Sequence, residues 1–275
     1  VLAASAASVL MCGVFPATFG VPQALLREGA RTDSPTGRRT LHALVVGQVA
    51  LAIVLGIGAA LMTRSLVALQ SVDPGFDAGQ VLTLKLQPSG ERYRGLVRTL
   101  AYYRRVLHRI DTLPGVEAAG AINHLPLSGY NWTSTGRLVE RPLPPGVSPP
   151  TVGWRMIEGD YFSSMRIPLQ AGRRFTEHDT NETPAVAIVN EAFARQYFGD
   201  ARSALGRTIR TGSASGEQTP TIVGVVGDVR HRALAEEPRP EMYRPVAQSF
   251  AIALAVTVRT AGPPARAVGE VPKNK

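Results

Sequence analysis

An uncharged apolar stretch constrains the fold of this chain more than any other feature. Between Arg39 and Arg64 the sequence contains no Asp, Glu, Lys or Arg, and its most polar members are His42 and Gln48. A helix over residues 41–63 would be ~34 Å long at ~1.5 Å per residue, and the hydrocarbon core of a bilayer is ~30 Å thick. Its Leu, Ile and Val residues would lie on every side, whereas a helix packed on a soluble core keeps a polar face. A wholly buried helix would need a larger core than the rest of the chain offers. We therefore predict a transmembrane helix over residues 41–63, followed by a connector over residues 64–80.

A second uncharged stretch, residues 1–26, opens the sequence. A secretory signal would begin with a basic segment, so we expect these residues to be the end of an earlier transmembrane helix and its exit. A disordered or interfacial segment is the alternative. The loop between the two stretches, residues 27–40, carries four arginines against one Glu and one Asp. Because basic loops stay on the cytoplasmic side, this loop is predicted to be cytoplasmic and the chain after about Arg64 extracytoplasmic.

The composition of the chain is that of a folded domain with a small membrane part. Hydrophobic residues make up 44% and aromatic residues 6%, which is ordinary for a globular protein. The formal net charge of +9 comes from scattered arginines without interleaved aromatic residues, so we expect no nucleic acid among the partners. The one cysteine, Cys12, lies in the first apolar stretch. The outer domain is therefore expected to be stabilised by its core and not by disulfides.

Sequence periodicity predicts an α+β extracytoplasmic domain over residues 81–262, with a C-terminal tail over residues 263–275. Strands are expected over residues 81–87, 116–122, 152–157, 185–189, 206–210, 221–229 and 252–260, and helices over 94–113 and 191–198. Asp160 is the expected cap of a helical turn over residues 159–165, and Asn190 that of the second helix. A Pro- and Gly-rich surface loop over residues 125–150 leaves open a hinge between two lobes, and another helix is expected from Pro263.

No motif in the sequence predicts catalysis, a bound cofactor or a metal. "GVVGDVR", residues 224–230, lacks the Lys of a phosphate-binding loop, and its glycines indicate a bulge or a close backbone approach. "HRALAEEPRPE" places His231 near Glu236, Glu237 and Glu241. A proline-broken loop does not fix metal-ligand geometry, so we expect a solvated acidic loop. "VDPGFD" indicates a turn after the membrane helix rather than a calcium site.

Six stretches, in order, resemble the permeases of MacB/FtsX-type ABC transporters, in their duplicated form with a MacB-like periplasmic core domain. They are "FPATFGVPQALLREGAR", "LVVGQVALAIVLGIGAALMTRSLVALQSVDPGFD", "YYRRVLHRIDTLPGVEAAGAINHLPLSG", "GDYFSSMRIPLQAGRRFTEHD", "VAIVNEAFARQYFGD" and "TIVGVVGDVRH". The resemblance covers roughly residues 10–260. It implies a MacB-like periplasmic core domain attached to transmembrane helices in the bacterial inner membrane.

The resemblance also implies a function and partners. A separate cytoplasmic ATPase subunit binds ATP and drives helix motions, which reach the periplasmic domain as mechanical work, so the permease itself holds no cofactor. Partners would be that ATPase, further permease helices or a second permease copy, the lipid bilayer and periplasmic proteins. The three closing spans of the family do not follow the core domain here, so a fragment or a truncated gene product is expected.

Two other classes of function stay open. One is a membrane-tethered extracytoplasmic binding or sensor module, which would show a deep polar pocket in the outer domain. The other is a membrane-anchored hydrolase, which would need titratable residues that converge in such a pocket.

The membrane helix also carries candidate packing residues. Gln48, Ala52, Gly56 and Ala60 are spaced by four and form one stripe along the helix. Small residues at this spacing let helices approach closely in lipid, and the amide of Gln48 can bond a neighbouring helix. We predict that this stripe faces other permease helices or a second copy, and that Leu51, Val54 and Leu55 face lipid.

Overall fold

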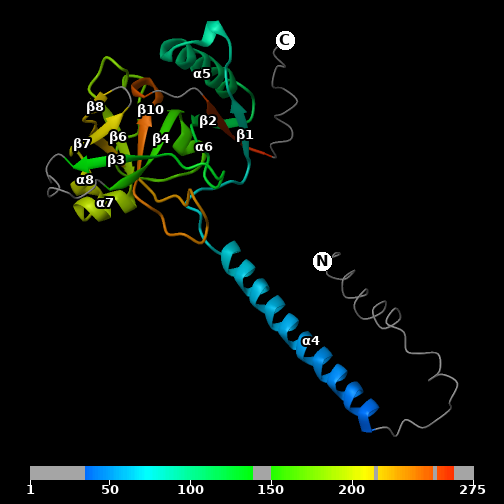
Figure 1. Ribbon diagram of the computed structural model, residues 1–275. Coiled ribbons are helices and arrows are strands. Elements are labelled where there is room, and N and C mark those ends of the chain that lie inside the picture. Colours follow the sequence, from blue (N-terminus) through cyan, green and yellow to red (C-terminus); the bar gives the residue numbers. More distant parts are fainter. Residues whose placement is uncertain (1–34, 139–149, 214–215, 250–252, 263–275) are drawn as a thin grey trace. The chain divides into compact units, whose positions relative to one another are not determined.

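The computed structural model describes residues 35–138, 150–213, 216–249 and 253–262 (Figure 1). The helix end expected in residues 1–26, most of the loop over residues 27–40 and the helix expected from Pro263 lie outside the described residues. The chain divides into two compact units, Val1–Ala68 and Leu69–Lys275.

The described part of the first unit is one long helix, α4, at Pro35–Gln70. Within it, His42–Gln70 is long and apolar enough to cross a bilayer, with a mean hydropathy of 2.4 and no buried residue. The helix continues beyond the predicted residue 63 because Arg64 is followed by the apolar turns of residues 65–69. It ends shortly before Asp73-Pro74, where the proline disfavours helical backbone in the residue before it.

The second unit is built on one mixed β-sheet. The strands of its main path follow the order β1-β11-β2-β4-β10-β6-β9-β5. Their bounds are Val81–Leu86 (β1), Val116–Ile122 (β2), Thr151–Gly159 (β4), Leu169–Gly172 (β5), Val186–Asn190 (β6), Thr221–Val226 (β9), Glu241–Pro245 (β10) and Leu254–Thr260 (β11). β4 pairs with β10 in parallel, as β6 does with β9, and the other neighbours on this path are antiparallel. A ribbon of β3 (Thr133–Leu138), β7 (Ile209–Ser213) and β8 (Gly216–Gln218) extends from β4.

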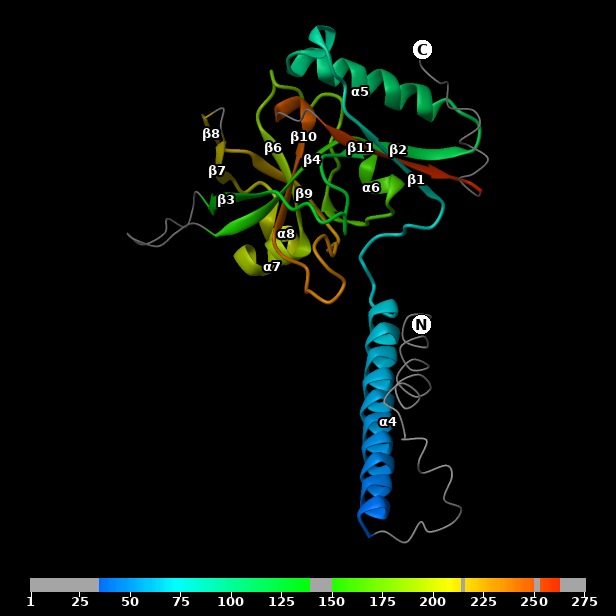
Figure 2. The same ribbon diagram turned by 45° about the vertical axis from the view of Figure 1, so that its right-hand side comes forward.

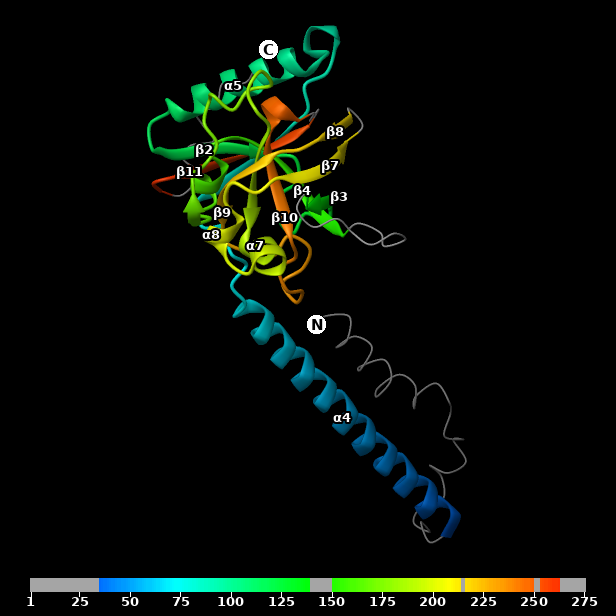
Figure 3. The ribbon, with the colours of Figure 1, turned by 90° about the vertical axis from the view of Figure 1, so that its left-hand side faces the viewer.

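Successive residues of a strand point to opposite faces of a sheet, and this alternation produces two cores. On one face Ala121, Met156 and Met242 pack with α5 (Leu96–Asp111), α7 (Glu191–Phe198) and α8 (Ala201–Ala204). On the other face their neighbours Ile122, Ile157 and Tyr243 pack with α6 (Tyr161–Ser164). Figure 2 shows α5 and α6 on opposite sides of β2 and β11, and Figure 3 shows α7 beside α8. Two single-turn 3-10 helices, Glu91–Tyr93 and Val246–Gln248, complete the described elements.

Most of the predicted elements are confirmed, some with shifted ends. The strand at Val116–Ile122 and the helix at Glu191–Phe198 match the predicted bounds. The Asn190 side chain caps α7 by accepting a hydrogen bond from the Phe193 N–H. Asp160 precedes α6 as predicted, but its side chain makes no capping bond and instead lies 3.2 Å from Arg174 Nη1.

Four predictions of local structure were wrong or incomplete. The stretch predicted as a loop over residues 125–150 contains β3, which pairs with β4 and β7. The strand predicted over residues 206–210 begins later, at Ile209, and pairs with β8 in a hairpin. β5, β8, β10 and α8 were not predicted at all, and each has five residues or fewer. The two-lobe arrangement does not occur in the part that the structure describes, since β2, before the Pro-rich stretch, pairs with β4, after it, within one unit.

Candidate functional site

The segment that leaves α4, residues 71–80 and called the connector below, is bonded to three separate parts of the sheet unit. Asp77 N–H donates to Met165 O just after α6 (3.0 Å). The Pro74 carbonyl accepts from the Arg230 N–H, in the loop after β9 (2.9 Å). The Gln80 carbonyl accepts from the Thr260 N–H at the end of β11 (3.0 Å). The connector is therefore part of the folded unit and not a free tether.

The buried guanidinium of Arg259 is the centre of these contacts. Its side chain is 2% exposed and lies on β11. It donates to the carbonyls of Ser164 (2.9 Å), Gly79 (2.9 Å) and Asp77, and its Nη1 lies 3.3 Å from Asp77 Oδ2. One arginine therefore joins α6, the connector and β11 with charge-assisted hydrogen bonds, which are about twice as strong as neutral ones.

The Asp77 carboxylate complements this arginine from the connector side. Its Oδ1 accepts from the Gly79 N–H (2.8 Å), and its Oδ2 accepts from Arg166 (2.9 Å). The bond from Gly79 holds the pKa of Asp77 below its ordinary value against the opposing effect of burial, and Arg259 and Arg166 lower it further. The carboxylate therefore stays ionised at neutral pH.

Gly75 allows the connector to approach the loop after β9 closely. Its φ is +79°, and a methyl group added there would lie 1.8 Å from the Asp228 carbonyl oxygen. The Asp228 side chain in turn accepts from the Ala192 N–H at the start of α7 (2.7 Å) and from Asn190 (2.8 Å). The connector, the loop and the start of α7 therefore meet at one point.

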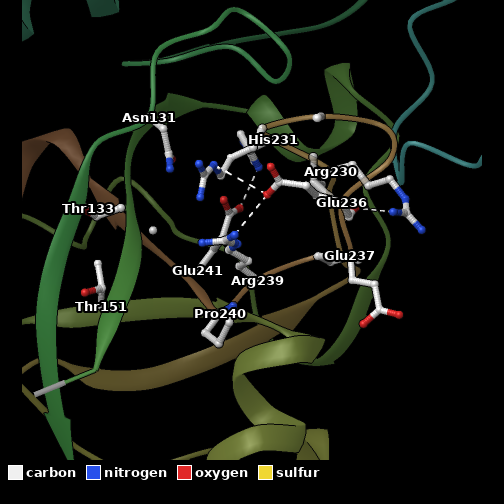
Figure 4. Close-up of a pocket in the computed structure, with 15 residues that line it drawn as sticks. Asn131, Thr133, Thr151, Arg230, His231, Glu236, Glu237, Arg239, Pro240 and Glu241 are labelled. Atoms are coloured by element: carbon white, nitrogen blue, oxygen red, sulfur yellow. Dashed lines mark hydrogen bonds and ion pairs between the residues drawn. The ribbon is translucent and has the colours of Figure 1, made fainter.

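A polar pocket of about 440 Å³ lies beside this loop, between β3, β4 and residues 230–241 (Figure 4). At its wall His231 and Glu241 are 5% and 3% exposed. His231 Nδ1 lies 2.7 Å from Glu241 Oε2, and Arg155 Nη2 donates to Glu241 Oε1 (2.8 Å). The hydroxyl of Tyr243 donates to Oε2 (3.2 Å). Asn131 accepts a second bond from Arg155 (2.7 Å).

The electrostatics of this cluster favour an ionised Glu241. Burial works to raise its pKa, but the charges and bonds of His231 and Arg155 outweigh burial and keep the pKa below the ordinary value. Burial also raises the pKa of Tyr243 well above its ordinary value. No group of three or more potential metal ligands occurs among the residues that the structure describes.

Comparison with protein families decides the assignment of the fold. The sequence profile of the family described as "MacB-like periplasmic core domain" matches residues 49–271. The chain belongs to this family. The domain is one found in ABC-type transporter permeases, and the predicted family and α+β fold class are thereby confirmed. A comparison with curated proteins gives no match.

Three solved structures are similar to the MacB-like core domain of this chain. The extracellular domain of the noncanonic ABC-type transporter YknZ from Gram-positive bacteria has 21% identity and a TM-score of 0.41, over 66% of this chain and 84% of that one. The periplasmic region of MacB from Actinobacillus actinomycetemcomitans has 14% identity and a TM-score of 0.43, over 68% and 77%. A domain of a putative permease protein from Porphyromonas gingivalis has 17% identity and a TM-score of 0.40, over 69% and 77%.

The structure of the core domain corrects one prediction about local chemistry. His231 and Glu241 were expected in a solvated acidic loop, but both are buried and lie in contact. Glu237 alone of the three glutamates is exposed to solvent as predicted, and Glu236 is half-buried. Glu241 is buried because it lies on β10 between β4 and β6, rather than in the loop.

The prediction for the glycines of residues 224–230 is confirmed. The pairing of β6 with β9 shifts register between Ala187 and Ile188, which leaves a bulge before Gly224. A methyl group at Gly224 would lie 2.3 Å from the Arg173 carbonyl oxygen. The turn predicted from "VDPGFD" is present too, closed by the Asp73 carboxylate, which accepts from the Gly75 N–H (2.8 Å).

Two buried arginines of the core domain were not predicted from the sequence. Arg155 and Arg259 each stand within an otherwise apolar strand, "VGWRMI" and "IALAVTVRT". A charge at a core position is a visible signal, because a buried charge needs a partner. The predicted packing residues Gln48, Ala52, Gly56 and Ala60 all lie on α4 and are exposed.

Proposed function

We propose that this chain is a permease subunit that couples a separate cytoplasmic ATPase to motions of its MacB-like domain, for export or for mechanical signalling. The observation that carries this proposal is the bonded connector. It is continuous with a helix that is apolar enough to span a membrane, and Arg259 joins it to α6 and β11. A displacement of the connector would therefore move the sheet instead of being absorbed in a loose linker.

The proposal includes a location and a set of partners. The helix spans the bacterial inner membrane as one of several spans, with residues 27–40 in the cytoplasm and the core domain outside, because of the arginine bias of that loop. ATP is bound by the ATPase subunit, and the chain itself catalyses nothing and holds no cofactor. Other permease helices, or a second copy, pack against α4, and periplasmic proteins meet the outer domain.

The test compares two glycines that share a positive φ but not their surroundings. Gly75 and Gly90 both have positive φ, and a methyl group at Gly90 meets no atom within 4 Å. An alanine therefore strains the backbone at both sites by about 1–3 kcal/mol, but only Gly75→Ala also pushes the connector away from Asp228. The two variants would be expressed with the ATPase that co-purifies with the chain, in membranes.

We expect Gly75→Ala to uncouple the complex. ATP hydrolysis should continue, but its rate should no longer depend on the periplasmic domain. Gly90→Ala should behave as the unchanged chain does. Circular dichroism of both variants checks that the domain still folds. Equal coupling in the two variants, or no ATPase in the purified complex, would contradict the proposal.

A membrane-tethered binding or sensor module is the second candidate, and the pocket beside His231 favours it. The pocket is polar, and the buried side chains of His231 and Glu241 meet at its wall. This candidate does not require an ATPase. It would be supported by a ligand that binds the chain while no ATPase co-purifies with it.

A further inference from the structure

The loop over residues 230–241 holds one carboxylate between two arginines, and all three side chains line the polar pocket. Glu236 Oε2 lies 3.2 Å from Arg239 Nη2 and 3.7 Å from Arg232 Nε. Figure 4 shows the Glu236 side chain turned toward Arg239 and His231, while Glu237 points away. Two guanidinium groups around one carboxylate are the arrangement by which proteins bind carboxylates and phosphates.

The bond between Glu236 and its two arginines is weak. Both arginines are exposed, and exposed ion pairs contribute only about 0–1 kcal/mol. Glu236 Oε2 is itself buried, yet it accepts no well-formed hydrogen bond from any residue that the structure describes. The loop stays closed by other bonds, since Arg230 donates to the carbonyls of Leu234 (3.1 Å) and Glu236. Displacing the Glu236 carboxylate would therefore leave the loop in place.

An independent feature of the pocket wall points to a missing partner. His231 lines the pocket, although only 5% of its surface is exposed. Its Nε2 has no hydrogen-bond partner within the described part of the chain, and neither has Nε of Arg155 behind it. A buried polar nitrogen without a partner costs about 1–3 kcal/mol. A ligand oxygen in the pocket would remove part of this cost.

Charge decides the class of ligand. Three arginines line the pocket, Arg230, Arg232 and Arg239, and they face two glutamates, Glu236 and Glu237. Glu241 also lines the pocket, but its charge is already balanced by Arg155. The pocket therefore has an excess of positive charge. We propose that the pocket binds an oxyanion, a carboxylate or a phosphate, which takes the place of the Glu236 carboxylate between Arg232 and Arg239. The site is independent of the proposed coupling to an ATPase, and either can fail without the other.

The experiment uses two glutamates that are adjacent in sequence and opposite in orientation. The full chain in phosphatidylcholine nanodiscs is titrated calorimetrically with inorganic phosphate and with succinate. Glu236→Gln removes the internal competitor and should tighten binding about two- to fivefold. Glu237→Gln changes the net charge equally, but this side chain points away from Arg239, so it should tighten binding less than Glu236→Gln does. Arg239→Gln removes a charge-assisted bond and should weaken binding about tenfold.

A second arm separates a soluble anion from a lipid headgroup. The same variants are placed in nanodiscs with phosphatidylglycerol, and phosphate is titrated again. If headgroups occupy the site, they compete with phosphate, and Arg239→Gln abolishes that competition. If they do not, the ligand is a soluble anion. The proposal is overturned if the two glutamate variants behave alike, if Arg239→Gln binds as the unchanged chain does, or if no anion binds.

Discussion

Three arginines on the strands of the core domain are fully buried, and their partners differ sharply. Arg259 is bonded to the connector, and Arg155 is paired with Glu241. Arg244, on β10, donates to Gln218 (3.0 Å), while its Nε and Nη1 have no hydrogen-bond partner in the part of the chain described here. Its guanidinium lies 5.9 Å from the ring centre of Trp154. Burial lowers the pKa of Arg244 to about 10.

We predict that Arg244→Met does not destabilise the domain and stabilises it by up to about 4 kcal/mol, as replacements of poorly compensated buried charges do. Arg259→Met is the matched change and should destabilise it by about 3 kcal/mol or more, because it removes the charge-assisted bonds to the carbonyls of Ser164, Gly79 and Asp77. Urea unfolding of both variants measures the two free energies. A loss of stability in Arg244→Met would indicate that this arginine has a partner.

The sequence contained the signal for these residues but not their pairing. A single arginine in an apolar strand indicates a buried charge, and both Arg155 and Arg259 could have been singled out. The partner of Arg259 is Asp77, which is 182 positions away in the chain. The partner of Arg155 is Glu241, 86 positions away. No local pattern specifies contacts over such separations, because they depend on the order of strands in the sheet.

At the scale of elements, the strands that were predicted are those with two buried faces or a clear alternation. β2 and β6 consist almost wholly of small or branched apolar residues, so their burial was visible in the sequence. The strands that were missed, β3, β5, β8 and β10, contain no run of more than two apolar residues. Pairing with neighbouring strands makes them strands, and tertiary pairing of this kind overrides local propensity.

The stripe on α4 carries a prediction at this scale. Gly56 has no atom within 4 Å of an added methyl group, so a larger side chain there leaves the helix itself intact. If the stripe with Gln48, Ala52 and Ala60 packs against another helix, Gly56→Leu weakens association in membranes by about 1 kcal/mol or more, and Leu55→Ala does not. Association is measured by energy transfer between labelled chains in vesicles. The opposite result would place the contact on the Leu55 face.

At the scale of the molecule, the core domain has the features of an independent folding unit. Residues 69–275 form one compact unit, with a hydrophobic core on each face of its sheet. The connector bonds of Arg259 and Arg230 also lie within this unit.

We therefore expect the segment from about Gln70 to Ala261, expressed alone, to fold cooperatively and to hydrolyse no ATP. Circular dichroism during heating tests the first part, and phosphate release from ATP tests the second. A non-cooperative transition would mean that α4 is needed for the fold. ATP hydrolysis by the purified segment would mean that the chain is an enzyme after all.

The two ends of the core domain lie next to each other on neighbouring strands. Val81, where the chain enters the sheet, is paired with Arg259, one residue before β11 ends, and the strands run antiparallel from there to Leu86 and Leu254. A force that separates the two ends would break the pairing of β1 with β11 one residue pair after another, and would not act on all pairs at once. The first pair to break is the one that Arg259 reinforces through Asp77 and Gly79. The domain therefore has a buried, charge-assisted side-chain contact at the place where a pulling force would begin to separate its sheet.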